Sequence, residues 1–329
     1  MISLNEFYGT PSELYLREQD EKKRIKYIGK IAGLCIIGYV FIQNILSVLL
    51  FAGPLGTVYE NDPDFQSVAA IFFSIAGILI PFGIGGRFIK KRTGTDIFNL
   101  GKPVDTKLML YAVPFGFFIC LAGNYVTGIF VNVMEEIGIH LTSPEYVVPS
   151  DFAGRFIYTV SIAVIPPLVE EFAIRGVVMQ PLRKYGDKFA IVASSIVFAV
   201  LHGNLIQAPF ALIAGIGIGY AVCLTNSVWT GVLIHAANNL YSVILEFMIE
   251  EISDEALLDK VYFVTMLVLY AVSIAGSVIF IIRRKNRRVM PSFTALPEGR
   301  KMFSFVWSIP MIFALLIMYG ITKNYIELG

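Results

Sequence analysis

Three ionisable side chains lie close together in an otherwise apolar stretch, and their types suit acid–base chemistry. The stretch is VEEFAIRG, residues 169–176, in which Glu170, Glu171 and Arg175 stand among Val, Phe, Ala and Ile. Glu171 and Arg175 are four residues apart with the acid first, the favourable order for a helical ion pair. Glu170 lies about 100° further round the same helix. Arg175 can therefore hold one carboxylate in place while the other points elsewhere, where it could serve as a base.

Two further polar sites follow within the next apolar segments. FAVLH places Phe198 and His202 four residues apart on one helical face, and HAANN does the same for His235 and Asn239. The chain has three histidines, and these two both lie in apolar segments. If successive helices bring them to the depth of Glu170, a glutamate and two histidines meet in an apolar interior. Such a group is suited to catalysis.

Each of these sites also has a structural explanation. An intramembrane Glu–Arg pair can fix one helix against another, and a histidine in a membrane helix is often a packing residue. Three such sites within 70 residues are more than packing requires, so we favour a chemical site. A transporter or proton pathway built on the same residues is an alternative. No inverted repeat that pairs two broken helices is found in the sequence, which disfavours a transporter.

Composition identifies the class of protein that must position these residues. Of the 329 residues, 56% are hydrophobic and 16% are charged, and the mean hydropathy is +0.70. Soluble domains carry about 25% charged residues, so the chain is a polytopic membrane protein with the lipid bilayer as its surroundings. It has no basic patch with interleaved aromatics, and we expect no nucleic acid partner. The cysteines, which lie in apolar runs without metal-ligand spacing, are expected to be packing residues.

Apolar segments predict an all-α fold, a polytopic transmembrane helix bundle of about eight or nine spans. A helix needs about 20 mostly apolar residues to cross the hydrocarbon core. The proline pair Pro166-Pro167 lies inside the fourth segment and predicts a kink or break there. The catalytic core would come from spans four to seven. The predicted spans are 31–52, 67–89, 107–133, 153–182, 188–203, 207–225, 227–249, 261–282 and 303–322.

The chain divides into four regions on this basis. Residues 1–30 form an N-terminal tail, 31–152 the N-terminal transmembrane helices, 153–249 the catalytic core, and 250–329 the C-terminal transmembrane helices. The tail contains a short predicted helix. Its start has Thr10 as N-cap, Pro11 at the first helical position and Glu13 to complete a capping box.

Basic residues predict the orientation. With the N-terminus inside, 22 of the 26 Lys and Arg residues fall in inner segments, as expected for cytoplasmic loops. We therefore expect an integral protein of the plasma membrane with a cytoplasmic N-terminus. Glu170 lies nearer the inner end of the fourth span, so access to it is expected from the cytoplasmic side.

The three polar sites resemble the motifs of a known family. EEFAIR is similar to EExxxR, FAVLH to FxxxH and HAANN to HxxxN, in this order on successive predicted helices. Together they resemble the CAAX protease and bacteriocin-processing (CPBP) family of intramembrane proteases, related to the eukaryotic prenyl-protein endopeptidase that trims CAAX tails. The resemblance covers residues 153–249. It implies an intramembrane endopeptidase that acts on a membrane-associated or lipidated, CAAX-like peptide.

The resemblance also implies a role for each residue. Glu170 would be the general base that activates a water, and His202 would hold and orient that water. His235 and Asn239 would stabilise the oxyanion of the tetrahedral intermediate. The supporting residues would be Glu171, Arg175 and Phe198.

Two alternatives remain open at this point. The first is a zinc-dependent protease, because Glu170, His202 and His235 are a plausible ligand set with water in the fourth position. The chain has no HExxH motif, and we favour the mechanism without a metal or other cofactor. The second is a non-enzymatic membrane protein, such as a bacteriocin immunity factor or a scaffold, that uses the polar site only for binding.

Overall fold

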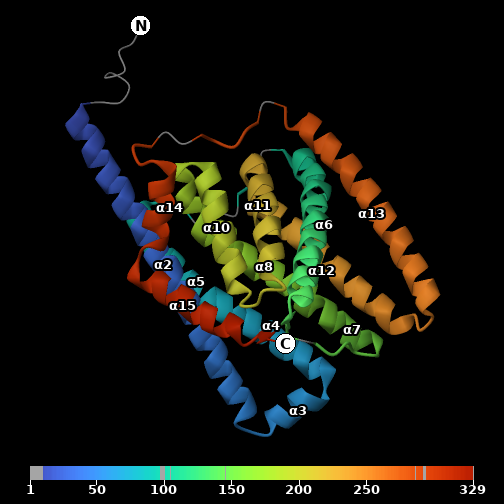
Figure 1. Cartoon of the computed structure of the whole chain (residues 1–329). Helices are drawn as coiled ribbons and strands as arrows, with labels where there is room; N and C mark the ends of the chain where they lie inside the picture. Colours follow the sequence, from blue (N-terminus) through green and yellow to red (C-terminus); the bar gives the residue numbers. More distant parts are fainter. Residues whose placement is uncertain are drawn as a thin grey trace.

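The protein is a bundle of helices with one short two-stranded ladder (Figure 1). The computed structural model describes residues 10–96, 101–103, 105–144, 146–285, 287–291 and 294–328. The helices are α2 (Pro11–Phe51), α3 (Leu55–Asn61), α4 (Pro63–Ser74), α5 (Ile80–Thr93), α6 (Thr106–Glu136), α7 (Phe152–Thr159), α8 (Ile165–Glu171), α9 (Gln180–Leu182), α10 (Asp187–Leu201), α11 (Ala208–Thr225), α12 (Val228–Glu251), α13 (Glu255–Arg283), α14 (Glu298–Val306) and α15 (Ile309–Lys323). The connecting helical turns are π-helical in η1 (Ile75–Leu79), η2 (Val160–Val164) and η3 (Phe172–Met179), and 3₁₀ in η4 (Arg183–Tyr185).

The predicted all-α polytopic bundle is confirmed, with some differences in the spans. Within the described residues, seven helical segments are long and apolar enough to cross a membrane, or eight if the bent pair α14–α15 is one span. The predicted span 188–203 corresponds to α10, which has only 15 residues. At 1.5 Å per residue it is about 22 Å long, shorter than the hydrocarbon core. The predicted span 303–322 is two helices that meet at 73°.

The N-terminal helix starts as the sequence predicts but does not end where expected. The side chain of Thr10 accepts from the amide of Glu13, and the Glu13 side chain accepts from the amide of Thr10, so the capping box is formed. From Pro11 the helix runs for 41 residues without interruption into the first apolar segment. The predicted short tail helix is therefore the first part of α2. This helix packs against α5, α14 and α15.

The two ends of the bundle are distinguished by the tail and the ladder. Strand β1 (Ile139–Leu141) pairs antiparallel with β2 (Ile326–Leu328), which brings the C-terminal segment to the loop that follows α6. Figure 1 shows the start of α2 at the opposite end of the molecule. We call the end where α2 begins the tail end, and the end that carries β1 and β2 the ladder end.

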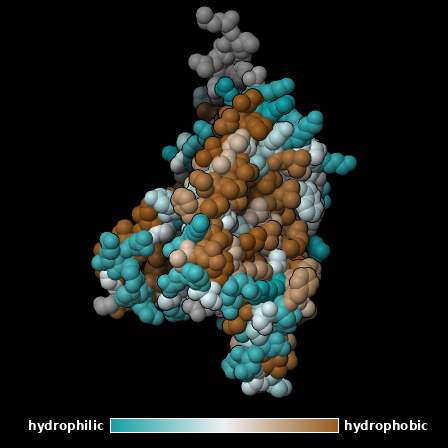
Figure 2. Space-filling model, turned by 90° about the vertical axis from the view of Figure 1, so that its right-hand side faces the viewer, coloured by the Kyte–Doolittle hydropathy of each residue, from teal (hydrophilic) through white to brown (hydrophobic). Residues whose placement is uncertain are grey.

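The outer surface has the distribution expected of a protein embedded in lipid. Figure 2 shows hydrophobic residues over the middle of one face and hydrophilic residues gathered toward its extremes. On α13, for example, the apolar side chains of Phe263, Leu267 and Val272 are exposed. Exposed apolar area of this extent is unfavourable in water and favourable in a bilayer. The protein is therefore an integral membrane protein.

Candidate active site

A continuous helical path presents the two glutamates. It runs from Phe152 to Tyr185 through α7, η2, α8, η3, α9 and η4. A kink or break was predicted at Pro166-Pro167, and the helix is distorted there without being interrupted. The hydrogen bonding widens just before the prolines, and the amide of Ile165 donates to the carbonyl of Val160, five residues back. Val164, with φ −117°, takes up the distortion, and the prolines then open α8, where a missing amide donor is tolerated.

The carbonyl that Pro166 leaves without a donor finds a partner on another helix. In an α-helix, the amide at position 166 would bond to the carbonyl of Ile162, but proline has no amide hydrogen. The side-chain nitrogen of Asn239, on α12, donates to that carbonyl at 2.9 Å. Asn238 donates in turn to the side-chain oxygen of Asn239 at 3.4 Å. Asn239 therefore ties α12 to the distorted turn beside the candidate base.

The predicted ion pair between Glu171 and Arg175 is present and fully buried. Nε of Arg175 donates to Oε2 of Glu171 at 2.9 Å, and both side chains have 0% exposure. Gly231 on α12 admits this pair, because a Cβ at that position would collide with Oε2 of Glu171. The spacing of four residues thus pairs Arg175 with the second glutamate.

Glu170 has a different environment. Its side chain is 21% exposed and lines a cavity of about 730 Å³. His235 lies between the two acids: its Nε2 is 3.9 Å from Oε2 of Glu170, and its Nδ1 is 3.3 Å from Oε1 of Glu171. The imidazole therefore connects the cavity-facing acid with the buried ion pair.

His202 lies at the end of α10 with its orientation fixed by its own helix. Its Nδ1 is 2.8 Å from the carbonyl oxygen of Phe198. Because a carbonyl can only accept, Nδ1 carries the hydrogen and Nε2 of the neutral ring has a free lone pair. His202 lines the same cavity as Glu170. Its Nε2 is thus available to accept a hydrogen bond from a water or a substrate.

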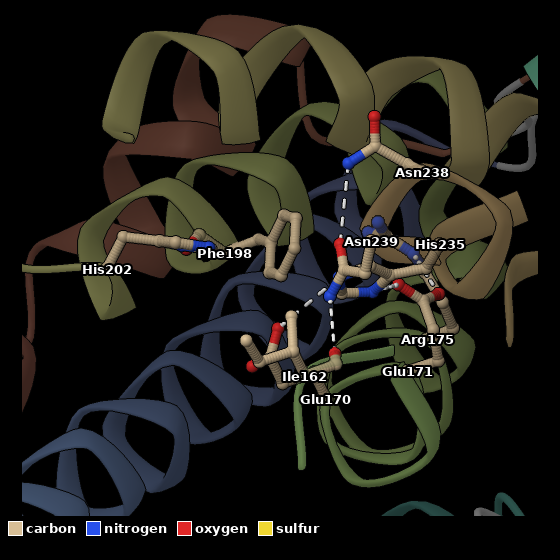
Figure 3. Close-up of polar contacts among 9 residues, drawn as sticks. All are labelled: Ile162, Glu170, Glu171, Arg175, Phe198, His202, His235, Asn238 and Asn239. Carbon is tan, nitrogen blue, oxygen red and sulfur yellow. Dashed lines mark hydrogen bonds and ion pairs between the residues drawn. The ribbon is translucent and has the colours of Figure 1, made fainter. Parts of the chain in front are cut away.

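The ring of Phe198 lies between the two imidazoles (Figure 3). Its centroid is 4.8 Å from that of His202 and 5.6 Å from that of His235, with near-perpendicular planes in both cases. The guanidinium carbon of Arg175 lies 5.5 Å from the same centroid, a cation–π distance. Phe198 is therefore a central packing residue of the site and keeps the two histidines apart.

The arrangement does not fit a zinc site made of Glu170, His202 and His235. Glu170 and His235 are neighbours, but the ring of Phe198 lies between His235 and His202 (Figure 3). Within the described part of the chain, no three His, Cys, Asp or Glu side chains are grouped closely enough to hold a metal ion. A site with both histidines as ligands would require a rearrangement around that ring.

The cavity extends from the polar residues toward the ladder end. Its wall includes Tyr59 on α3, Gln66 on α4, Val147 after β1, Gln207 just before α11 and Glu246 near the end of α12. These segments lie at the end opposite to the tail. The cavity therefore reaches the ladder end, while access to Glu170 from the cytoplasmic side stays a prediction that depends on the orientation in the membrane. Residue position along the fourth span does not show which end of the bundle the side chains leave open.

Three participants in the site were not singled out from the sequence. Gly231 lies four residues before His235, on the same helical face, and this spacing was the signal for it. Asn238 is buried and lines the cavity, but its neighbour Asn239 was the residue with the motif spacing. Nothing in the residue type of Ile162 marks its carbonyl as part of the site. The only indication is Pro166, four residues later, which has no amide hydrogen to donate to that carbonyl.

Fold and site together define a class: a polytopic helical membrane protein with a glutamate and histidines around an internal cavity. Residues 152–241 match a protein-family model described as "Type II CAAX prenyl endopeptidase Rce1-like". This match, over 90 of the 329 residues, confirms the resemblance drawn from the three motifs and supports a CAAX-type intramembrane protease in general terms. No curated protein and no solved structure matches the chain.

Proposed function

We propose that the protein hydrolyses peptide bonds of a membrane-associated or lipidated, CAAX-like peptide, with Glu170 as the base. One observation above all supports this assignment: Glu170 reaches the 730 Å³ cavity, whereas Glu171 is sealed behind it with Arg175. A general base must reach the proton that it removes. Of the two adjacent acids, Glu170 meets that requirement.

In the proposed mechanism, a water binds between the carboxylate of Glu170 and the bare Nε2 of His202. Glu170 removes a proton from this water as its oxygen attacks the scissile carbonyl carbon. The C–N bond then breaks, and Glu170 returns the proton to the leaving amine. General base catalysis of this kind contributes about 10²–10⁴-fold to a rate.

The proposed oxyanion site uses His235 and Asn239. The carboxylate of Glu171 is 3.3 Å from Nδ1 of His235, and since a carboxylate only accepts, it favours a hydrogen on that nitrogen. Nε2 of the same ring points toward Glu170 and the cavity, and it can donate to the oxyanion only when the ring carries a hydrogen on both nitrogens. Asn239 donates one of its amide hydrogens to the carbonyl oxygen of Ile162. The second amide hydrogen is available for the oxyanion. One donor of an oxyanion site contributes about 10²–10³-fold to kcat.

The proposed mechanism uses no metal and no other cofactor. The position of Phe198 between the two histidines supports it, because the candidate zinc site needs both imidazoles as ligands.

We further propose that the tail lies in the cytoplasm and that the protein resides in the plasma membrane. The concentration of 22 of the 26 basic residues in segments expected at the tail end supports this orientation. The cavity mouth at the ladder end would then face the outside, and the peptide would enter from there.

Labelling with a membrane-impermeant maleimide tests the access route. The variants are Ser143→Cys, at the cavity mouth, and Ser12→Cys, on the tail, in a background with Cys120→Ala, since Cys120 lines the cavity. Intact cells are expected to label the first and not the second. The reverse pattern would overturn the orientation.

Cleavage of a reporter peptide tests the activity. Glu170→Ala and His202→Ala are each expected to abolish cleavage while the protein still inserts into membranes. Full activity of the Glu170→Ala protein would contradict the proposal. A purely binding role would instead leave the biological phenotype of both variants intact. Comparison of membrane peptides from cells with wild type and with Glu170→Ala would identify the substrate.

A further inference from the structure

A second open groove, of about 940 Å³, lies at the tail end of the bundle. Its walls come from the first turns of α10, from α11, from the segment after α13 and from α14. Figure 1 shows that segment passing from α13 toward α14 across the tops of the intervening helices. The groove is separate from the Glu170 cavity, which opens toward the ladder end.

The side chains of the groove are ordered by polarity along the helices. Lys188 and Val192 lie four residues apart on one face of α10, with the charge at the helix end and the apolar group one turn deeper. Val192 is 40% exposed, and Phe189 and Met302 add apolar wall. A charged rim above an apolar wall matches the two parts of a phospholipid.

Two arginines after α13 complete the rim. Arg284 donates from Nη1 to the hydroxyl of Tyr220 at 2.7 Å, which holds its guanidinium over the groove. Arg288, four residues further along the chain, lines the same groove. Arginine and lysine nitrogens are strong donors to phosphate oxygens.

The rim has a net positive charge. Its acidic residue, Glu298, accepts from Nζ of Lys301 at 2.6 Å and so has its own cation. The side-chain nitrogen of Lys188, by contrast, has no hydrogen-bond or ion-pair partner among the residues that the structure describes. The three basic side chains therefore exceed the acids at this groove.

We infer that this groove binds an anionic phospholipid. The phosphate would lie among Lys188, Arg284 and Arg288, and an acyl chain would follow Phe189 and Val192 into the bilayer. Basic pockets between membrane helices at the headgroup level are suited to such lipids, and each basic residue contributes about fivefold to the affinity for an anionic surface.

The test uses the full-length protein, purified in an uncharged detergent, stripped of lipid and titrated with phosphatidylglycerol or with phosphatidylcholine of the same acyl chains. Native mass spectrometry counts the bound lipids. The wild type is expected to prefer phosphatidylglycerol, and Arg284→Gln/Arg288→Gln to bind it roughly 25-fold more weakly. Equal binding of the two lipids by the wild type would overturn the inference.

The matched control is Arg283→Gln/Lys285→Gln, which removes the same charge from exposed neighbours outside the groove. It is expected to bind phosphatidylglycerol like the wild type, and an equal loss in both double variants would reject a defined site. Because Arg284 also holds Tyr220, Lys188→Gln is measured as well, with an expected loss of about fivefold. Displacement of the lipid by inorganic phosphate at equal concentration would reject the role of the apolar wall.

Discussion

Glu170 and Glu171 are neighbours on one helix, but their side chains lie on different faces and differ in exposure to solvent. Glu170 faces the cavity with 21% of its side chain exposed, and Glu171 has 0% exposure. A charge that is sealed from solvent must be paired, whereas a base must reach a solvent-filled space. One step along a helix is enough to separate these two requirements.

The sealed face is well enclosed but not fully hydrogen-bonded. Glu171 meets Arg175 through Nε, while Nη1 and Nη2 of Arg175 have no hydrogen-bond partner among the described residues. The ring of Phe198 covers the guanidinium at 5.5 Å. The buried pair is therefore held by few contacts. Loss of the charge of Glu171 or of Arg175 should affect the stability of the fold more than catalysis.

The sharpest test of the comparison exchanges each acid for its amide. Glu170→Gln is expected to lower the rate of reporter cleavage by about 10²–10⁴-fold, because the amide cannot accept the proton. Its apparent Tm in detergent should equal that of the wild type. Glu171→Gln should show the opposite pattern, with a lower Tm and part of the activity retained at low temperature. Equal kinetic losses with equal Tm values would mean that the two faces do not have separate roles.

Removal of the buried cation should have the next largest effect. Arg175→Met leaves the carboxylate of Glu171 buried without its partner and is expected to cost about 3–5 kcal/mol of stability. Thermal unfolding in detergent measures it. In the double variant Glu171→Gln/Arg175→Met most of the stability should return, since no unpaired charge is left. If the double variant were as unstable as the single one, packing and not charge would be responsible.

Gly231 lies so close to the carboxylate of Glu171 that the effect of an added methyl group can be compared with its effect at a glycine in open space. A Cβ at Gly231 would press on the pinned carboxylate of Glu171, so Gly231→Ala is expected to cost about 1–3 kcal/mol. A Cβ added at Gly128, on α6, would meet nothing within 4 Å, and Gly128→Ala is the matched control. It should be neutral or stabilising by about 0.5–1 kcal/mol. The two Tm shifts should therefore have opposite signs or clearly different sizes.

The link between Asn239 and Ile162 can be isolated with a double-mutant cycle. Asn239→Ala leaves a carbonyl without its donor, with an expected cost of about 1–3 kcal/mol. Pro166→Ala supplies a backbone amide that can bond to the same carbonyl. The cost of Asn239→Ala should therefore be smaller in the Pro166→Ala background. Additive Tm changes would show that Asn239 does not act through this carbonyl.

The sequence predicted local features of this site better than its spatial arrangement. The capping box at Thr10 and the pairing of Arg175 with a glutamate follow from spacing along one helix, and both are present. The place of Phe198 between two imidazoles depends on how α10 and α12 pack, which residue spacing does not encode.

The same limit explains two differences between the predicted and the observed helices. The short length of α10 reflects burial within protein rather than lipid, and apolar composition looks alike in both settings. The proline pair predicted a kink or a break, and the sequence does not show that the helix stays continuous or that Asn239, 77 residues away, takes over the freed carbonyl. Tertiary contacts decide both outcomes.

The smallest expected effect concerns metal ions. If the catalytic functions are supplied only by Glu170, His202, His235 and Asn239, a strong chelator should leave reporter cleavage unchanged, and purified active protein should contain no stoichiometric zinc. The geometry favours this outcome because Phe198 lies between the two candidate histidine ligands. The control is a known zinc protease under the same conditions. Loss of cleavage that added zinc restores would mean that His202 moves past Phe198 to join Glu170 and His235, and the cavity face would then be a metal site rather than a carboxylate base.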